Sequence, residues 1–390
     1  MKHLVIRNFG PVKEVDIKLK RVNLIIGPQS SGKSTVLKVA CFCDWMERQI
    51  ELTQKPWEYC NHNAVLSNLI EFHKLSGYMN PDTFISYEND AVAFSYSAKD
   101  KECKFEWRND RKWNYQRVKI AYIPAERNIV ATIPNWYQIS MKNDNVLDFM
   151  KQWEFARKAF VKGEQIMGLP VKYSYSPGDM GDRLSLTNGK GIDLTVASSG
   201  LQSLTPLYIV LRYLTSFYFK ENHTSVEQNM LSENLLNVIS EECPNQSLQQ
   251  QLDIVERIMT PHHTDFFIEE PEAHLFPSTQ KTFIYSLVEM LNGRKNHACF
   301  IATHSPYIMT SFNNVILAGE ASKESVEKSD AVGRLIPRQQ TLTFDEVAAF
   351  EINNGSIRSI MDDEFRLISA DAIDSASQEI ANDFDYILNL

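Results

Sequence analysis

Hydrophobic and polar positions divide the chain into blocks with different periods. Residues 22–26 form a short, continuous apolar run, which is typical of a buried strand, and helical spacing follows over 35–40. Two more apolar runs of this kind lie at 264–268 and 298–302. Because buried strands that alternate with helices are typical of parallel sheets, this pattern predicts an α/β fold.

A period of two takes over between 84 and 123, and helical periods dominate most of the remaining chain. The alternating runs predict an antiparallel meander with strands at 84–87, 92–96, 103–107 and 113–123. Helices are expected at 41–76, 145–166, 201–219 and 277–292. The polar segment 220–262 has little apolar surface to bury, and we expect it to form two helices inserted into the domain.

The composition is that of an ordinary globular protein. Of the 390 residues, 43% are hydrophobic and 23% charged, and the apolar runs are too short to predict a transmembrane span. The N-terminus lacks the long apolar core of a signal peptide. Six scattered cysteines without CxxC pairs predict no disulfide framework and indicate a reducing cytoplasm. The net charge of −9 argues against a protein devoted to coating nucleic acid, but leaves room for a local basic groove.

A glycine-rich turn links the strand at 22–26 to the helix that follows. It reads Gly-Pro-Gln-Ser-Ser-Gly-Lys-Ser over 27–34, which is the spacing of a P-loop. The two glycines allow backbone N–H groups to face one phosphate, and the helix adds its positive N-terminal end. Lys33 is expected to contact the β- and γ-phosphates, and the Ser34 hydroxyl to bind Mg²⁺. The residues expected to bind the nucleotide are Gly27, Pro28, Gln29, Ser30, Ser31, Gly32, Lys33, Ser34 and Thr35.

Two adjacent acids, Glu269 and Glu270, follow the apolar run at 264–268. Successive side chains at a strand end point in different directions, so one carboxylate can hold Mg²⁺ while the next orients the attacking water. We assign Glu269 to the metal and Glu270 to the water. Glu272 is interpreted as structural or interfacial.

Two further features lie at strand and helix ends. His304 follows the third apolar run, at the edge where ligands bind in open α/β sheets, and is expected to sense the γ-phosphate. Ser198, Ser199 and Gly200 open the apolar helix at 201–219 and offer a second anion site. Alone, a Ser-Ser-Gly helix start is more often a simple cap.

Together these four motifs, in this order, resemble the ABC-type ATPases, and within them the RecF/SMC/OLD-like branch. The opening Ile-Arg-Asn-Phe-Gly at 6–10, the Glu-Glu-Pro-Glu-Ala-His-Leu-Phe-Pro segment at 269–277 and Ala-Thr-His-Ser-Pro at 302–306 carry the resemblance. It implies an ATPase domain over 1–320, with an antiparallel β lobe, a parallel-sheet core and a helical lobe. Helical or inserted segments are expected at about 41–80, 135–195 and 220–262, and a C-terminal extension at 321–390 that packs on the core.

The resemblance also implies a mechanism. Two subunits would pair head to tail, with ATP and Mg²⁺ held by the P-loop of one and by Ser198, Ser199 and Gly200 of the other. The signature reads Ala-Ser-Ser-Gly-Leu at 197–201 instead of Leu-Ser-Gly-Gly-Gln, and its long distance from Glu269 argues against a transporter subunit. The Tyr-Ile-Pro-Ala-Glu-Arg-Asn segment at 122–128 resembles the Q-loop region but has no glutamine. Glu126 or Arg127 is therefore a candidate to sense the γ-phosphate, and the alternative is a structural ion pair.

Three functions follow from these observations. The first is an ATP-driven switch that controls a separate effector, a nuclease or toxin, as in stand-alone ATPases of bacterial anti-phage defence. About 70 residues follow the third strand, too few for a Toprim nuclease domain, and the tail from 346–355 through 384–390 resembles that of the stand-alone proteins. The second is a RecF-like DNA-binding repair ATPase, for which the basic and aromatic stretch 101–119 is the candidate surface. The third is a nucleotide sensor without turnover.

Overall fold

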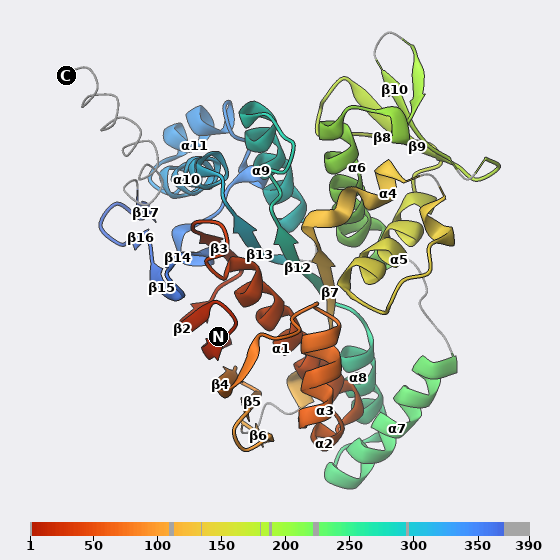
Figure 1. Cartoon of the computed structure of the whole chain (residues 1–390), viewed down its shortest axis with the longest axis vertical. Coiled ribbons are helices and arrows are strands. Elements are labelled where there is room, and N and C mark those ends of the chain that lie inside the picture. Colours follow the sequence, from red (N-terminus) through yellow and green to blue (C-terminus); the bar gives the residue numbers. More distant parts are fainter. Residues whose placement is uncertain are drawn as a thin grey trace.

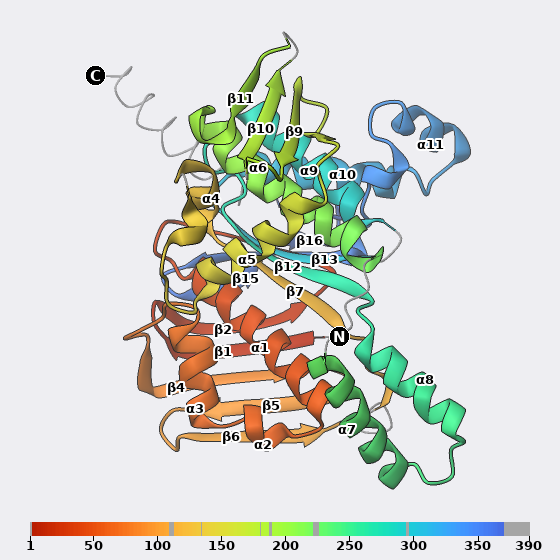
Figure 2. The same cartoon turned by 90° about the vertical axis from the view of Figure 1, so that its right-hand side faces the viewer.

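The computed structural model describes residues 2–108, 113–133, 135–179, 181–186, 189–220, 226–293 and 296–369. Within these ranges, one 11-stranded sheet runs through the molecule, in the order β6-β5-β4-β1-β2-β15-β14-β3-β13-β12-β7. Figures 1 and 2 show its antiparallel part beside α1–α3 and its parallel part between layers of helices. The α/β fold with an antiparallel lobe, a parallel core and a helical lobe is confirmed.

The parallel core is built from the continuous apolar runs. Its strands are β3 (Val22–Ile26), β7 (Val118–Ile123), β12 (His263–Glu269), β13 (Ala298–Thr303) and β14 (Val347–Asn353). Alternate residues bury in opposite directions: Ile25 joins the core under α1, whereas Leu24 and Ile26 join the core under α6, α9 and α10. In register, Glu269 pairs with Ala302 and Thr303 pairs with Ile26, so the carboxyl ends of these strands meet at one edge.

The antiparallel lobe holds most of the predicted meander. Its strands are β1 (Lys2–Phe9), β2 (Val12–Leu19), β4 (Met79–Glu88), β5 (Val92–Ser97) and β6 (Glu102–Trp107). Strand β15 (Ser356–Ser359) joins this lobe to the parallel core, because it pairs in parallel with β2 and antiparallel with β14. The expectation that 113–123 continues this meander is wrong. Instead, β7 lies at the opposite edge of the sheet, parallel to β12, because its buried residues pack under α1 on one face and α5 on the other.

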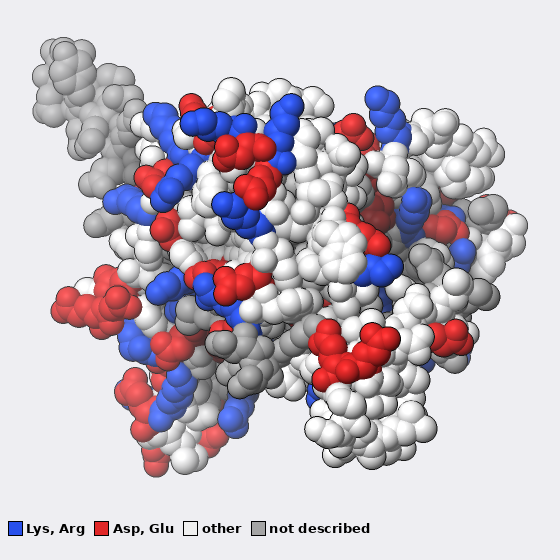
Figure 3. All heavy atoms as spheres, turned by 90° about the horizontal axis from the view of Figure 1, so that it is seen from below, with Lys and Arg blue, Asp and Glu red and all other residues white. Residues whose placement is uncertain are grey.

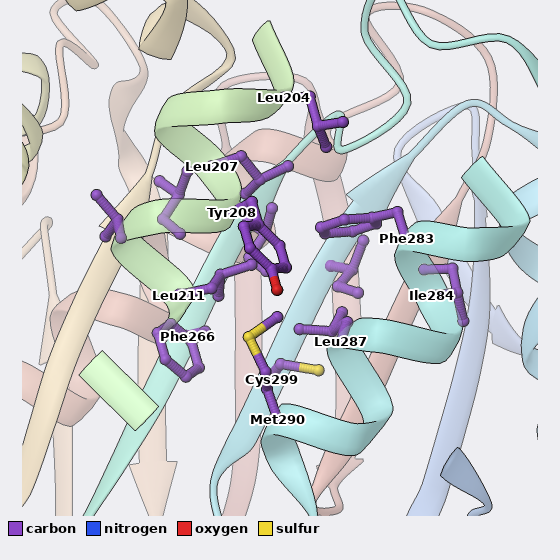
Figure 4. Packing of buried hydrophobic residues seen from close by; sticks show 14 of the residues in the cluster. Leu204, Leu207, Tyr208, Leu211, Phe266, Phe283, Ile284, Leu287, Met290 and Cys299 are labelled. Carbon is purple, nitrogen blue, oxygen red and sulfur yellow. The ribbon is translucent and has the colours of Figure 1, made fainter. Parts of the chain in front are cut away.

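Helices cover both faces of the parallel strands. The α-helices are α1 (Lys33–Thr53), α2 (Pro56–Tyr59), α3 (His62–Val65), α4 (Ile129–Thr132), α5 (Asn145–Lys158), α6 (Ser199–Arg212), α7 (Val226–Glu242), α8 (Leu248–Met259), α9 (Pro277–Leu291), α10 (Pro306–Ala321) and α11 (Val326–Gly333). Short π and 3₁₀ turns are η1 (Leu66–Glu71), η3 (Ala125–Asn128), η4 (Trp136–Gln138), η5 (Leu194–Val196), η6 (Tyr213–Phe217), η7 (Tyr218–Lys220), η8 (Arg338–Gln340) and η9 (Phe344–Glu346). In Figure 4, the apolar faces of α6 and α9 meet over β12 and β13, with Leu207, Phe266 and Leu287 between them.

The segments predicted as insertions differ in how they fold. The segment 220–262 contains α7 and α8, as expected; these two helices pack on each other and on α1. The expected helix at 145–166 ends at Lys158, and a small sheet follows: β8 (Glu164–Gln165), β9 (Val171–Ser176), β10 (Gly181–Leu186) and β11 (Gly191–Asp193). The alternating sequence Val-Lys-Tyr-Ser-Tyr-Ser at 171–176 is the pattern that predicts a strand in this sheet.

The C-terminal extension contributes a strand to the central sheet. Strand β14 pairs in parallel with β3, and Val347 opposes Val22. It continues into β15 and then into the two-stranded β16 (Met361–Asp362) and β17 (Leu367–Ile368). The segment 384–390 lies outside the described residues.

The prediction of no disulfide is wrong for one pair of cysteines. Cys60, after α2, is bonded to Cys103 on β6, and their Cα atoms are 5.2 Å apart. The two residues are separated by 43 positions, and only the docking of the α2–α3 segment beside the edge of the antiparallel lobe brings them together. Across the ranges given above, none of the helices is long and apolar enough to cross a membrane.

Candidate functional site

Three of the predicted motifs meet where the parallel strands end. The P-loop follows β3, Glu269 ends β12 with Glu270 directly after it, and His304 follows β13, which lies between the other two strands. Lys33, the first residue of α1, turns its ammonium back over the loop, and its Nζ donates to the carbonyl oxygens of Gly27 at 2.8 Å and Pro28 at 2.6 Å. The Lys33 ammonium is therefore held against the backbone of the predicted phosphate loop.

The two loop glycines are required by close contacts with neighbouring strands. A Cβ on Gly27 would lie 2.2 Å from the carbonyl oxygen of Ile352, at the end of β14. Gly32 has φ +110°, and a Cβ there would lie 2.9 Å from the Val12 side chain. The contact with Ile352 shows that the C-terminal strand supports the P-loop, a role that the sequence did not indicate.

The charge and the unpaired groups of the loop suit a phosphate ligand. Burial lowers the pKa of Lys33 to about 8, although the nearby acids Glu270 and Glu272 act in the opposite direction. The buried hydroxyl of Ser31 has no hydrogen-bond partner among the described residues. A triphosphate would supply both an anion for the ammonium and acceptors for the hydroxyl, so the residues fit the expected nucleotide.

Glu269 is buried and held by several donors. Tyr122 donates its hydroxyl to Oε1, the backbone N–H of Ala125 donates to Oε2 at 3.2 Å, and the Lys38 ammonium lies 3.7 Å from Oε1. Oxygen ligands such as this carboxylate and the Ser34 hydroxyl are the type that Mg²⁺ prefers. Sequence reasoning missed Tyr122 and Lys38; Tyr122 lay inside the quoted 122–128 segment, whereas Lys38 gave no signal.

Glu270 and His304 are brought together at the mouth of the site. Glu270 has φ +42°, and its N–H donates to the Ala302 carbonyl at 2.8 Å, which turns the side chain away from the strand. Its carboxylate lies 3.5 Å from Nε2 of His304, and both side chains are partly exposed. Glu272 accepts a hydrogen bond from the backbone N–H of His304 at 2.6 Å, so it positions the histidine segment, in line with the structural role expected for it.

Arg127 and Glu126 occupy different environments. Arg127 is fully buried, and its guanidinium donates to the carbonyl oxygens of Glu269 at 2.9 Å and Glu270 at 2.8 Å. It also donates to Ser203 on α6, at 3.2 Å to the hydroxyl. Burial lowers its pKa to about 10, so it remains charged at neutral pH. These contacts make Arg127 a clamp between β12 and α6, whereas the neighbouring Glu126 is exposed.

The signature segment lies apart from the P-loop. Ser198 is the N-cap of α6, Ser198 and Ser199 are exposed, and a Cβ on Gly200 would lie 3.1 Å from the His274 carbonyl. Among the described residues, no hydrogen bond or ion pair joins 198–200 to the loop at 27–35. In Figure 1, α6 lies to the right of β7 and β12, away from the loop between β3 and α1. The structure thus collects three motifs in one site and leaves the fourth separate.

Comparison with known proteins supports an ATPase domain. The family AAA_15, described as AAA ATPase domain, matches residues 1–262 and 260–309. A search of curated proteins finds no match.

Solved structures with similar chains include SMC head domains and a recombination mediator protein. An SMC head domain from Thermotoga maritima is 10% identical, with a TM-score of 0.39, covering 92% of this chain and 97% of that chain. An Smc head domain from Pyrococcus furiosus, bound to the C-terminal domain of ScpA, is 9% identical, with a TM-score of 0.41 and coverage of 98% and 100%. The recombination mediator protein RecF is 10% identical, with a TM-score of 0.32 and coverage of 92% and 97%. At these values the likeness carries no functional argument.

Proposed function

The chain belongs to the AAA ATPase domain family, and from this premise we propose that it is a Mg²⁺-dependent ATPase that works as a dimeric molecular switch. The observation that carries the proposal is the meeting of Lys33, Glu269, Glu270 and His304 at the ends of three adjacent strands. These side chains supply a phosphate-binding cation, a metal-binding carboxylate and an acid–base pair.

Nucleotide binding would begin with Lys33. Lys33 is buried, and within the described ranges its ammonium donates to the Gly27 and Pro28 carbonyls, which carry partial charges. The β- and γ-phosphates of ATP offer full negative charges, so we expect the ammonium to leave the carbonyls for them. The backbone N–H groups at the start of α1 would complete the cradle.

Ser34 and Glu269 are the residues that would hold Mg²⁺. When bound, the ion neutralises charge on the β- and γ-phosphates during transfer. Tyr122 and Lys38 keep the Glu269 carboxylate in one orientation, and Arg127 fixes the backbone that carries it.

Hydrolysis would depend on Glu270 and His304. The Glu270 carboxylate is turned out of the strand and exposed enough to accept a hydrogen bond from the attacking water. His304 lies 3.5 Å from that carboxylate, from where its imidazole can orient Glu270 and reach the γ-phosphate. Removal of the Glu270 charge should therefore stop turnover while leaving the binding groups in place.

A second subunit would complete the site. The exposed Ser198 and Ser199 at the start of α6 form an anion-binding end that reaches no part of the P-loop in the same chain. A head-to-tail pair with two-fold symmetry would place this end opposite the P-loop of the partner subunit and make two equivalent ATP sites.

We further propose that this switch controls a separate effector, such as a nuclease or toxin in bacterial anti-phage defence. Support comes from the sequence resemblance. The role as a DNA-binding repair ATPase remains the second candidate, with the stretch 101–119 as its surface.

The described part of that stretch is poorly suited to bind DNA as a basic surface. Arg108 is paired with Glu88 at 2.5 Å, Lys104 lies 3.7 Å from Glu102, and Arg117 donates to the Met259 carbonyl. Arg111 and Lys112 lie outside the described residues. Figure 3 shows Lys and Arg interspersed with Asp and Glu over this underside of the molecule. These observations favour the effector-control proposal over direct DNA binding.

The decisive experiment is the native mass of the Glu270→Gln variant, purified from its own host with ATP and Mg²⁺. We expect a dimer or larger assembly that retains ATP and carries a second protein. Glu324→Gln, an exposed carboxylate between α10 and α11, is the matched control and should hydrolyse ATP like the parent chain.

Two further variants test the parts of the proposal separately. Lys33→Ala should bind no ATP, and Ser198→Arg should bind ATP as a monomer without forming the pair. Full hydrolysis by Ser198→Arg would contradict the head-to-tail site. A Glu270→Gln dimer that comes away with DNA and no protein would favour the repair role instead.

A further inference from the structure

A large cavity lies between α6 and α9, apart from the ATP site. Its volume is about 1080 Å³, slightly above the range of about 300–1,000 Å³ that is typical of ligand sites. Its walls are formed by the second half of α6 with η6 and η7, by α9, and by the loop at 167–168, with Gln340 at the rim. A bound group in this cavity would touch both α6 and α9.

The rim of the cavity is basic. Its charged side chains are Arg212, Lys220, Lys281 and, among the described lining residues, a single acid, Glu289. Arg212 is paired with Glu164 at 2.9 Å, and Glu289 accepts a hydrogen bond from Gln340 at 2.8 Å. Lys220 and Lys281 lie over aromatic rings and have no acidic partner within the described chain. Two exposed ammonium groups therefore remain available to an anionic ligand.

The lining of the cavity combines large apolar and aromatic side chains with hydroxyl side chains. The apolar and aromatic ones are Met167, Tyr208, Phe219, Tyr285 and Met290, and the hydroxyl ones are Thr215, Ser216, Ser278, Thr282 and Ser286. Figure 4 shows Tyr208 of α6 turned toward α9, on the side where Met290 lies. An occupant that combines carboxylates with apolar side chains would satisfy both the rim and the interior.

The chain itself contains a segment with this composition. Over 371–390, every charged residue is acidic: Asp371, Asp374, Glu379, Asp383 and Asp385. The same segment carries Ile373, Ile380, Phe384, Tyr386, Ile387, Leu388 and Leu390. It lies outside the described residues, and its charge is complementary to that of the cavity rim.

The tether to this segment is short enough to make binding within one chain favourable. Asn313 on α10 holds Ile368 by two hydrogen bonds of 2.7 and 2.9 Å, and α10 packs against α9. The residues that follow Ile368 span up to about 70–80 Å when extended, whereas the 15 residues of α9 span about 22 Å. Tethering gives the segment a local concentration in the millimolar range, so weak pairing suffices.

We propose that the acidic segment 371–390 binds in the cavity between α6 and α9 of its own chain. Its carboxylates pair with Lys220 and Lys281, and its apolar side chains pack against Tyr208 and Tyr285. If the proposed composite ATP site is correct, this contact also regulates it, because α6 begins at the signature residues and α9 follows directly after the segment at 269–276.

Photocrosslinking in the full chain tests the contact directly. A benzoylphenylalanine placed at position 384 is irradiated without nucleotide, and the crosslinked peptides are identified by mass spectrometry. We expect crosslinks to residues of 208–220 and 278–290 within a single chain. The yield of these crosslinks should fall about tenfold in the Lys220→Glu/Lys281→Glu double variant. It should also decline between 50 and 500 mM NaCl, because both ammonium groups are exposed and their pairing is screened by salt.

The matched control is Lys151→Glu, an exposed lysine on α5 that does not line the cavity, which should leave the yield unchanged. Circular dichroism of each variant establishes that the fold is retained. Crosslinks elsewhere on the surface, crosslinks between two copies in a mixture of light and heavy chains, or a yield unaffected by the double reversal would overturn the proposal. Because no ATP is present, a failure of the ATP switch would not alter this result.

Discussion

Arg127 provides the sharpest test of how the site is held together. The sequence left two roles for it, contact with the γ-phosphate or a structural pairing, and the structure shows a fully buried guanidinium bonded to the backbone of Glu269 and Glu270. The perturbation we would make is Arg127→Met, which keeps a long apolar side chain but removes the charge and all of its donors. The carbonyls of Glu269 and Glu270 then lose their guanidinium partner.

The magnitude follows from those bonds. Two charge-assisted hydrogen bonds of 2.8 and 2.9 Å contribute about 1.5–3 kcal/mol each. Relief of the cost of burying the guanidinium, which is visible in its lowered pKa, offsets part of this loss. We expect a net decrease of about 3 kcal/mol in the free energy of unfolding, and a fall in melting temperature of several degrees.

The assay is urea unfolding followed by fluorescence, together with ATP binding to the folded variant. Arg127→Lys should recover only part of the stability, because an ammonium cannot span both carbonyls as the planar guanidinium does. Glu126→Gln, at the exposed neighbouring position, is the control and should change stability by less than about 0.5 kcal/mol. If Arg127→Met unfolds like the parent chain but fails to hydrolyse ATP, the clamp argument is refuted and phosphate contact is favoured.

Two further predictions concern the P-loop. Because the pKa of Lys33 is lowered to about 8 in the free protein and only the ammonium attracts phosphate, ATP affinity should fall as pH rises above about 8, whereas Lys33→Arg should show no such fall in a fluorescent-nucleotide titration. Parallel pH curves for the two proteins would exclude Lys33 as the titrating group. Gly27→Ala should lose ATP binding and melt at a lower temperature, because its Cβ would lie 2.2 Å from the Ile352 carbonyl oxygen. The control is Gly178→Ala, whose Cβ would meet nothing within 4 Å. This variant should bind ATP and melt like the parent chain in the same assays.

Local sequence patterns were sufficient to predict motifs whose residues are neighbours in the sequence. The P-loop, the two acids after β12 and the histidine after β13 are each contiguous, and parallel pairing of their strands brings them to one edge. The apolar runs predicted the core strands because a strand buried on both faces has to be apolar throughout. The pairing of Glu270 with His304 then follows from the order of these strands.

Sequence patterns gave the wrong place for a strand whose neighbours depend on the order of strands in the sheet. The run at 113–123 has the alternation of a meander strand, yet β7 lies at the opposite edge from β6. The bond between Cys60 and Cys103 and the support of Gly27 by Ile352 join residues that are far apart in the chain. No local period encodes such contacts, since they arise only when separate elements pack together.

The sequence by itself therefore predicted the candidate chemistry: a lysine proposed for phosphate, carboxylates proposed for metal and water, and a histidine beside them. Only the tertiary structure decided how these groups are supported, through Tyr122 and Lys38 at Glu269, Arg127 behind the β12 backbone and β14 beneath the P-loop. The physical reason is that catalytic groups are read from short segments with special residue types. The groups that hold them are ordinary residues, whose role comes from burial and from partners contributed by distant parts of the chain.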